Sequence, residues 1–188
     1  MTMWNLAVFN FIHAWSGHSV FADITAIFFA EYLPYLLVAG FLVLVFYQSG
    51  TRRKFYLFAE GAIAVILARG IVTEAIRFFY NVPRPFALLG FSPLIAESGA
   101  SFPSGHMTWF FALALVIWFA DRKWGFWYFV LSAAIGIARI YAGVHWPLDI
   151  VGGVAIGLAS GWLVHSLFRG VRAELIPAKK PESVDAVI

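Results

Sequence analysis

Long apolar segments with almost no charge constrain this chain more than any other feature of its sequence. Such a segment can form a membrane-spanning helix once it contains about 18 or more residues, because that length crosses the ~30 Å of hydrocarbon in a bilayer. Four segments are strongly apolar, at roughly 55–80, 103–121, 124–143 and 147–168, and a fifth, weaker one lies at roughly 32–48. Short links force neighbouring spans to run antiparallel. The sequence therefore predicts an all-α integral membrane protein, an antiparallel bundle of five or six transmembrane helices.

Composition indicates one membrane-embedded domain over residues 1–178, followed by a polar tail, 179–188, that we expect to be disordered and cytosolic. The 188 residues are 62% hydrophobic and only 12% charged. The lack of cysteine excludes disulfides, zinc–thiolate sites and thiol catalysis. The net charge of +3 does not indicate nucleic acid as a partner, because no soluble domain presents a contiguous basic face.

The positive charges orient the bundle. Basic residues close to the ends of spans favour the cytosol, and one side of the bundle receives nine of the 13 lysines and arginines, namely Arg52, Arg53, Lys54, Arg122, Lys123, Arg169, Arg172, Lys179 and Lys180. Arg77, Arg84 and Arg139 lie at or near the opposite ends of their spans. We therefore expect a multi-pass protein of the bacterial inner (plasma) membrane whose active site faces the periplasm or exterior.

Residues 1–30 fit two arrangements. The stretches 4–15 and 20–30 are apolar, each is too short to cross the membrane alone, and Ser16-Gly17-His18 separates them. They form either an interfacial helical hairpin, which we favour, or a bent sixth span. The start lacks the basic region that precedes the apolar stretch of a cleavable signal peptide.

Gly153, Gly157 and Gly161 recur every four residues along the last span. Glycines at this spacing allow a neighbouring helix to approach closely. The neighbour is either another helix of the bundle, which we prefer, or a helix of a second copy in a homodimer.

Groups capable of chemistry lie at the ends of the spans, first in Pro103-Ser104-Gly105-His106. The start of a helix offers unpaired N–H groups and a partial positive charge, which suit a phosphate, and Gly105 lets the backbone come close to it. His106 can then donate a proton to a departing oxygen. Taken alone, the motif is equally compatible with a serine cap beside an interfacial histidine.

His145 and Asp149 are four residues apart, where Pro147 favours the start of the last span. If the helix already includes His145, the two side chains share one face. A carboxylate bonded to one imidazole nitrogen leaves the other nitrogen free to attack phosphorus. The same pair could instead ligate a metal, or Asp149 could cap the helix beside an interfacial histidine. The pair alone does not decide among the three.

Three arginines at the same membrane face complete the set. Singly, each could pair with a carboxylate or with carbonyls at a helix end. Together, Arg77, Arg84 and Arg139 can neutralise the three equatorial oxygens of a phosphoryl transition state. Their convergence with the two histidines and Asp149 predicts a site that binds a phosphate, attacks it and protonates what leaves.

Other charged positions carry simpler expectations. Arg69 lies within a span, so we expect Glu60 or Glu74 to neutralise it. Glu97, in the outer loop that precedes residue 103, could touch the site, but we expect it to be solvated. His165 is expected to be a packing or interfacial residue.

The order and spacing of these residues resemble the motifs of the type 2 phosphatidic acid phosphatase superfamily. The first family motif, a basic residue followed after six residues by Arg-Pro, is matched by Arg77 with Arg84-Pro85. The second, Pro-Ser-Gly-His, is matched by residues 103–106. Arg77 replaces the commoner lysine of the family and keeps its charge.

The third family motif is Ser-Arg, five residues, His, three residues, Asp. It is matched by Arg139, His145 and Asp149, with Ala138 in place of the usual serine. This departure removes a hydroxyl without removing any group that transfers protons.

The resemblance implies a metal-independent phosphatase without a cofactor. In it, His145 forms a phosphohistidine, Asp149 orients His145, and His106 protonates the departing group. The residues implied to hold the phosphate are Arg77, Arg84, Ser104, Gly105 and Arg139.

Within this superfamily, the chain is similar to the bacitracin-resistance type of undecaprenyl diphosphatase at Asp23 and in the stretches 5–10, 31–34, 84–86 and 101–104. That resemblance implies removal of the terminal phosphate from undecaprenyl diphosphate, which recycles the lipid carrier for cell-wall synthesis. Phosphatidylglycerophosphate and phosphatidic acid stay open as substrates. The expected partners are therefore membrane lipids and a polyprenyl or glycerophospholipid phosphate.

Two rival functions use the same groups. Vanadium-dependent haloperoxidases share the phosphate-type site but are soluble, unlike this apolar chain. A non-catalytic lipid-phosphate binder or transporter would need the arginines, but it would need neither His106 as an acid nor His145 as a nucleophile.

Overall fold

The computed structural model describes the backbone of residues 2–175 and the side-chain surroundings of residues 2–170, so the tail at 179–188 lies outside the described residues. Within that part every regular element is helical, which confirms the expected all-α class. The elements are α1 (Met3–His13), α2 (Val20–Ile27), η1 (Phe28–Tyr32), α3 (Leu33–Phe46), α4 (Thr51–Val65), η2 (Ile66–Thr73), α5 (Glu74–Phe79), α6 (Pro85–Leu89), α7 (Gly105–Ala120), α8 (Arg122–Tyr141) and α9 (Pro147–Leu175), where η denotes a π-helical segment.

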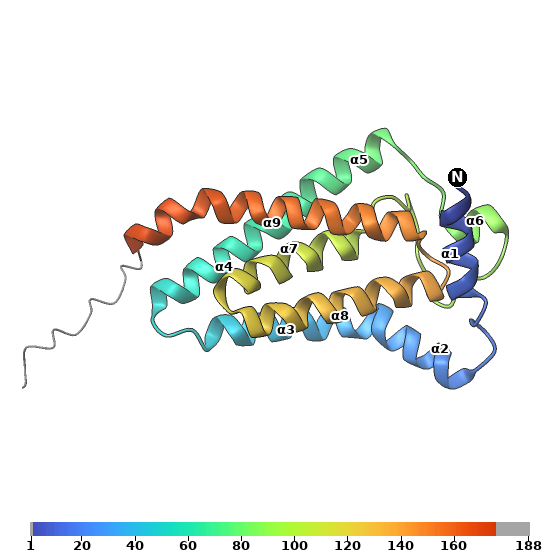
Figure 1. Cartoon of the computed structure of the whole chain (residues 1–188), viewed down its shortest axis with the longest axis horizontal. Helices are drawn as coiled ribbons and strands as arrows, with labels where there is room; N and C mark the ends of the chain where they lie inside the picture. The colour runs from blue at the N-terminus through green and yellow to red at the C-terminus, as the bar shows by residue number, and fades with distance from the viewer. Residues whose placement is uncertain (1, 176–188) are drawn as a thin grey trace, which may run out of the picture.

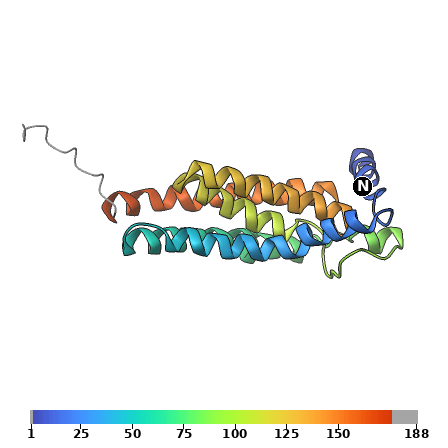
Figure 2. The ribbon, with the colours of Figure 1, turned by 90° about the horizontal axis from the view of Figure 1, so that it is seen from below.

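Five antiparallel rods build the bundle, and four of them are long and apolar enough to cross a membrane: Val20–Phe46, Thr51–Phe79, Arg122–Tyr141 and Pro147–Gly170. The first two are composite, because α2, η1 and α3 form one rod and α4, η2 and α5 form another. The shorter α7 runs through the centre of the bundle (Figure 1), and Figure 2 shows α8 and α9 in one layer and the two composite rods in the other. Its 16 residues include nine buried ones.

The structure differs from the hairpin expected for residues 1–30. The second apolar stretch continues through η1 into α3 as one 27-residue rod, and only α1 stays separate. Pro34 does not break this rod, although it lacks the N–H that a helix interior requires. The π-helical turn directly before it changes the local hydrogen-bond register. The span that was expected to begin near residue 32 therefore begins at Val20.

Helix α1 lies across one end of the bundle, where α9 begins and α8 ends (Figure 1). The Asn5 side chain accepts a hydrogen bond from the backbone N–H of Leu148 at 2.9 Å, in the first turn of α9. Phe9 is almost completely buried and its ring lies 4.9 Å from that of Trp146. Because α1 satisfies a free N–H of α9 and covers Trp146, it stabilises the connection that carries His145.

The three glycines of α9 pack against α7. A side chain at Gly153 would place its Cβ 2.7 Å from the carbonyl oxygen of Ser104, and one at Gly157 would lie 2.8 Å from that of Thr108. At Gly161 the same distance to a carbonyl of α7 is 3.0 Å. The stripe therefore serves close packing inside the bundle, the first of the two arrangements expected for it, and a homodimer would need another surface.

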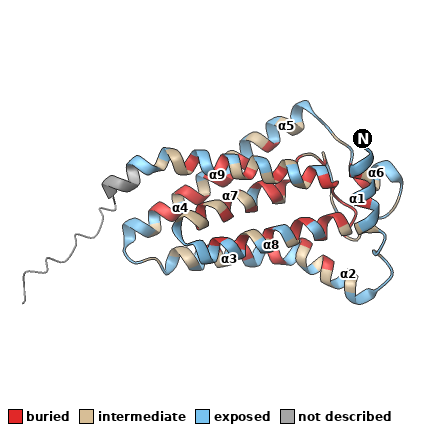
Figure 3. Cartoon of the chain, viewed as in Figure 1, coloured by how far each residue is buried: buried red, intermediate tan, exposed pale blue. Residues whose placement is uncertain are grey.

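The outer surface is largely apolar, and most of the described basic residues lie near the ends of the bundle. Large side chains such as Phe78, Phe79 and Leu167 are exposed, and in Figure 3 the exposed positions follow the outer sides of the rods, as expected when lipid surrounds the protein. The described basic residues of the α3–α4 and α7–α8 connections, together with Arg169, lie at the end opposite α1 and α6. The three motifs lie at the end near α1.

Candidate active site

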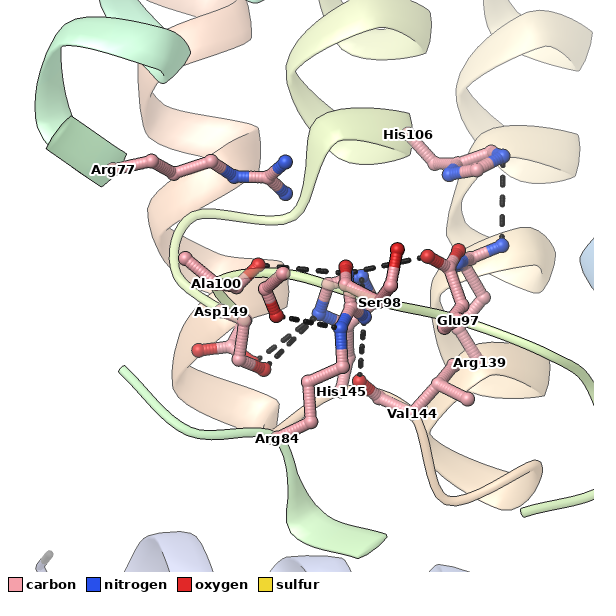
Figure 4. A network of polar contacts seen from close by, with 12 residues as sticks. Arg77, Arg84, Glu97, Ser98, Ala100, His106, Arg139, Val144, His145 and Asp149 are labelled. Atoms are coloured by element: carbon pink, nitrogen blue, oxygen red, sulfur yellow. Dashed lines mark hydrogen bonds and ion pairs between the residues drawn. The ribbon is translucent and has the colours of Figure 1, made fainter. Parts of the chain in front are cut away.

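Three connections meet at the α1 end of the bundle: the one after α5, the one before α7, and the one between α8 and α9 (Figure 4). Direct contacts join them. Arg77 donates a hydrogen bond to the carbonyl of Pro103 at 2.9 Å, and the backbone N–H of Ser104 donates to the carbonyl of Asp149 at 3.0 Å. The structure thus brings together all eight residues that the motifs nominate, although they are spread over residues 77–149.

Asp149 lies in the first turn of α9 and contacts His145, which lies just before that helix. Helix α9 begins at Pro147, so His145 precedes it, and the condition under which both side chains would share a helical face is not met. The contact still forms, with 3.2 Å between Nδ1 of His145 and Oδ2 of Asp149, because the same oxygen accepts the backbone N–H of Trp146 at 2.8 Å. Asp149 therefore closes the first turn as a capping carboxylate and orients His145 at once. The capping reading of this pair is therefore seen directly, and the contact with Nδ1 of His145 has the geometry that the nucleophile reading requires.

His145 is buried, with 1% of its side chain exposed. This burial, reinforced by the nearby cations Arg139 and Arg84, lowers the pKa of His145 well below its usual value. The imidazole is therefore neutral at physiological pH. With Nδ1 facing Asp149, a neutral ring leaves its lone pair on Nε2, the nitrogen that a nucleophile requires.

The start of α7 presents an unused hydroxyl. Ser104 is the N-cap residue, but its side chain makes no capping hydrogen bond, and its Oγ is buried without a partner. Gly105 and His106 follow in the first turn, where backbone N–H groups have no acceptor inside the helix. Nε2 of His106 lies 3.5 Å from Nη1 of Arg139. The cap reading of Ser104 fails, since its hydroxyl is available to a ligand.

Arg139 is held in the bundle by an acceptor that Pro34 leaves free. A helical N–H at position 34 would bond the carbonyl of Ala30, and proline has none. Nη1 of Arg139 donates to that carbonyl at 3.2 Å. The side chain is 2% exposed, and its Nε has no partner. The carbonyl of Ala30 thus fixes the position of Nη1, while the N–H of Nε can still donate a hydrogen bond to a ligand.

Arg84 has a different role from the other two arginines. It donates to the backbone carbonyls of Val144 at 2.9 Å, Ser98 at 3.0 Å and Gly99 at 3.2 Å. Its Nη1 also lies 3.5 Å from Nε2 of His145. Burial lowers the pKa of Arg84, while the Asp149 carboxylate opposes that shift. Arg84 therefore ties the loop before α7 to the α8–α9 connection and places a cation beside the free nitrogen of His145.

Glu97 bridges two of the motif arginines, which corrects the expectation that it would be solvated. One carboxylate oxygen pairs with Arg139, and the other lies 3.2 Å from Nη2 of Arg84. Its side chain is only 23% exposed. A carboxylate between two guanidinium groups occupies a position that an oxyanion ligand would also prefer. The sequence offered a signal for this, since Glu97 is the only acidic residue between Arg77 and His106.

Three buried side-chain atoms among the described residues lack any hydrogen-bond partner, namely Nε of Arg77, Oγ of Ser104 and Nε of Arg139. All three can donate a hydrogen bond, and all three belong to residues expected to hold the phosphate. Buried donors are normally satisfied, so three free donors at one place form a site suited to an anion with several acceptor oxygens. Within the described residues no group of three or more His, Cys, Asp or Glu is arranged to hold a metal ion.

Sequence reasoning included Ser101 only within the stretch 101–104 and gave it no role, and it left the ion-pair partner of Arg69 undecided. Ser101 is fully buried and its hydroxyl donates to Oδ2 of Asp149, and no motif spacing singled it out. Arg69 pairs with Glu74, one of its two expected partners. Glu60 pairs with His165 instead, with 2.6 Å between the two side chains. His165 also stacks on Phe119 at 3.7 Å, in agreement with the packing role expected for it.

Comparison with known proteins gives a consistent family and fold. The PAP2 superfamily model matches residues 58–172, which include all three motifs. Bacitracin transport permease protein BcrC of Bacillus licheniformis is 30% identical over 190 residues, covering 93% of this chain and 92% of that protein. Undecaprenyl-diphosphatase BcrC of Bacillus subtilis is 29% identical, covering 85% and 81%. The crystal structure of Aquifex aeolicus LpxE superimposes with a TM-score of 0.72 and 28% identity, over 88% of this chain and 96% of LpxE.

Proposed function

Because the chain belongs to the PAP2 superfamily, whose members are hydrolases of phosphate esters and anhydrides, we propose that it hydrolyses undecaprenyl diphosphate to undecaprenyl phosphate and inorganic phosphate through a phosphohistidine on His145. The similarity to undecaprenyl-diphosphatase BcrC over most of both chains supports this substrate. The proposal rests on the three unpartnered donors of Arg77, Ser104 and Arg139. They offer hydrogen bonds to the oxygens of a terminal phosphate at a place that is shielded from solvent.

The first half of the reaction transfers the terminal phosphoryl group to the protein. Nε2 of His145 forms a bond to phosphorus while the bond from phosphorus to the bridging oxygen breaks. The electron pair of that bond stays on the bridging oxygen, and His106 supplies a proton to it. Asp149 stabilises the positive charge that develops on the His145 ring. The arginines and the start of α7 stabilise the equatorial oxygens.

The second half returns the site to its starting state. A water molecule attacks the phosphohistidine in line with His145, and His106, now neutral, accepts a proton from that water. The bond between phosphorus and Nε2 breaks, and inorganic phosphate leaves. No metal ion enters either step, because the arginines already place positive charge where the phosphate would bind.

A second, wholly apolar cavity supports a lipid substrate. A cavity of about 230 Å³ lies between α3 and α4 and is lined by residues such as Phe41, Phe58 and Leu113. Val38 and Trp109 line both this cavity and another one that contains His106 and Arg139. A head-group space that adjoins an apolar cavity suits a phosphorylated lipid, whereas a soluble phosphate ester has no use for the second space.

We expect purified protein in detergent to release phosphate from undecaprenyl diphosphate with a higher kcat/KM than from phosphatidylglycerophosphate or phosphatidic acid. The rate should persist in the presence of excess chelator. A larger kcat/KM for a glycerophospholipid phosphate would replace the proposed substrate and leave the chemistry in place. Phosphate release that chelation stops and Mg²⁺ restores would make the charge argument incomplete, with Asp149 as a candidate ligand. No release from any of the three lipids would favour a non-catalytic binder.

On this proposal the active site faces the periplasm or exterior, since the basic connections lie at the other end of the bundle. The chain has no cysteine, so single cysteines can report topology. In intact cells a membrane-impermeant thiol reagent should label Ser92→Cys, in the exposed loop near the site, and should not label Ser49→Cys, in the exposed α3–α4 link. The reverse pattern would move the substrate to the cytosolic leaflet, where phosphatidylglycerophosphate would become the better candidate.

A further inference from the structure

A cavity of about 410 Å³, lined by both charged and apolar side chains, adjoins the site and contains an arginine that the proposed mechanism does not use. His106, Arg139 and Glu97 line it from the active site, while Arg69 and Glu31 line it from η2 and η1. Because His106 protonates the departing oxygen, the leaving group must lie next to this cavity. The chemistry of the cavity therefore bears on which leaving groups the protein accepts.

Arg69 lies directly against the start of α7. A Cβ added to Gly105 would lie 2.5 Å from Nε of Arg69 and 3.0 Å from its Cδ, so only glycine leaves room for the guanidinium stem there. The π-helical segment Ile66–Thr73 carries Arg69, and such segments shift the direction in which a helix presents its side chains. Arg69 thus adds a full positive charge to a helix start that already carries a partial one.

The charge of Arg69 is only partly neutralised within the described residues. Glu74 pairs with Nη1 of Arg69, and the same carboxylate oxygen lies 3.8 Å from Nη1 of Arg77. One carboxylate therefore serves two guanidinium groups, and its side chain is 52% exposed. A guanidinium has five N–H donors, so Arg69, itself 33% exposed, retains donors for a ligand in the cavity.

We propose that Arg69 binds the inner phosphate of a lipid diphosphate, the group that departs, and so makes the protein selective for diphosphates over phosphate monoesters. This inference rests on the proposed function. When a monoester is cleaved, the departing oxygen becomes a neutral alcohol once His106 has protonated it. When a diphosphate is cleaved, the departing group is a phosphate monoester that keeps a negative charge after the same protonation and carries about −1.5 to −2 charges once it equilibrates at neutral pH.

The charge balance explains why the cation matters for one class and not for the other. As the bond from the terminal phosphorus to the bridging oxygen breaks, its electron pair moves onto the inner phosphate. A fixed cation near that oxygen stabilises the transition state more than the ground state. Arg139 also lines the cavity, but the mechanism assigns it to the reacting phosphate, and the carbonyl of Ala30 engages its Nη1. Arg69 is therefore the cation suited to the departing group.

The test compares two substrates that share one lipid, farnesyl diphosphate and farnesyl monophosphate. Arg69→Gln should lower kcat/KM for the diphosphate by about 10- to 100-fold, at the low end of the cost of a lost donor because Arg69 is partly exposed. For the monophosphate, kcat/KM should fall by a few-fold at most. Arg69→Lys, which keeps the charge, should restore part of the diphosphate activity.

Arg77→Gln is the matched control, because Arg77 faces the reacting phosphate that both substrates possess and should lower both kcat/KM values together. Inhibition by vanadate, which occupies only the place of the reacting phosphate, tests whether Arg69→Gln keeps the site intact. An equal loss for both farnesyl substrates, or a parallel loss of vanadate inhibition, would show that Arg69 supports the whole site and would overturn the inference. An unchanged ratio of the kcat/KM values for farnesyl diphosphate and farnesyl monophosphate would also overturn it. A wild-type protein that cleaves neither diphosphate nor monophosphate would instead refute the proposed function.

Discussion

Replacing His145 with alanine should abolish turnover and the trapping of a phosphoenzyme, with a loss of ~10⁵-fold or more in kcat, as expected when a covalent nucleophile is removed. His145 is the one imidazole in the site with a carboxylate on Nδ1, at 3.2 Å from Oδ2 of Asp149. Its lowered pKa keeps it neutral, so the lone pair of Nε2 is available. Rapid quench with undecaprenyl diphosphate labelled in its terminal phosphate measures the turnover rate and the amount of labelled phosphoenzyme. The acid lability of the adduct then identifies it as a phosphohistidine.

Two further variants separate nucleophile from acid. His106→Ala should still become phosphorylated by a substrate with a good leaving group, because such a group departs without a proton. Asp149→Asn should reduce turnover by a smaller factor, on the order of 10³–10⁴-fold, since the ring loses its fixed tautomer but keeps its nitrogen. An acid-labile adduct that persists in His145→Ala would remove His145 from this role.

The overall architecture follows from features that the sequence displays directly. Apolar length sets the spans, and short basic connections set their alternation, so the five rods could be predicted to within a few residues at most ends. The start of the first span could not. Whether Pro34 ends a helix or lies within it depends on the π-helical turn at 28–32 and on Arg139, which satisfies the carbonyl that proline leaves free. That partner lies 109 positions away along the chain.

The same distinction applies to the site. Motif spacing nominated eight residues because helix ends bring them to one membrane face, and the structure collects all of them there. Glu97 and Ser101 escaped because each acts through a partner chosen in three dimensions, the two arginines for Glu97 and Asp149 for Ser101. Neither lies at a helical spacing from its partner. Loop side chains of this kind become visible only once the connection before α7 is folded over the ends of α8 and α9.

Replacing Arg139 with glutamine should lower kcat/KM by about 10²–10³-fold, the usual cost of one preorganised donor to a developing oxyanion. Arg139 is 2% exposed and donates to the carbonyl of Ala30, so its position is fixed before substrate binds. Arg139→Lys should recover only part of the loss, because an ammonium supplies charge without the planar fork. Steady-state kinetics per folded protein, with thermal unfolding as the folding control, checks this. A loss of stability with unchanged kcat/KM would make Arg139 structural.

The ion pair between Arg139 and Glu97 leads us to expect that a substitution of Glu97 strengthens phosphate binding, whereas a substitution of Arg139 weakens it. A phosphate oxygen and the Glu97 carboxylate cannot occupy one guanidinium edge together, so Glu97 must withdraw when substrate binds. Glu97→Gln should therefore strengthen inhibition by inorganic phosphate, and this gain should largely disappear in the Arg139→Gln background, because the two changes act on one contact. If Glu97→Gln weakens phosphate inhibition instead, the carboxylate positions Arg84 and Arg139 for the ligand and does not compete with it.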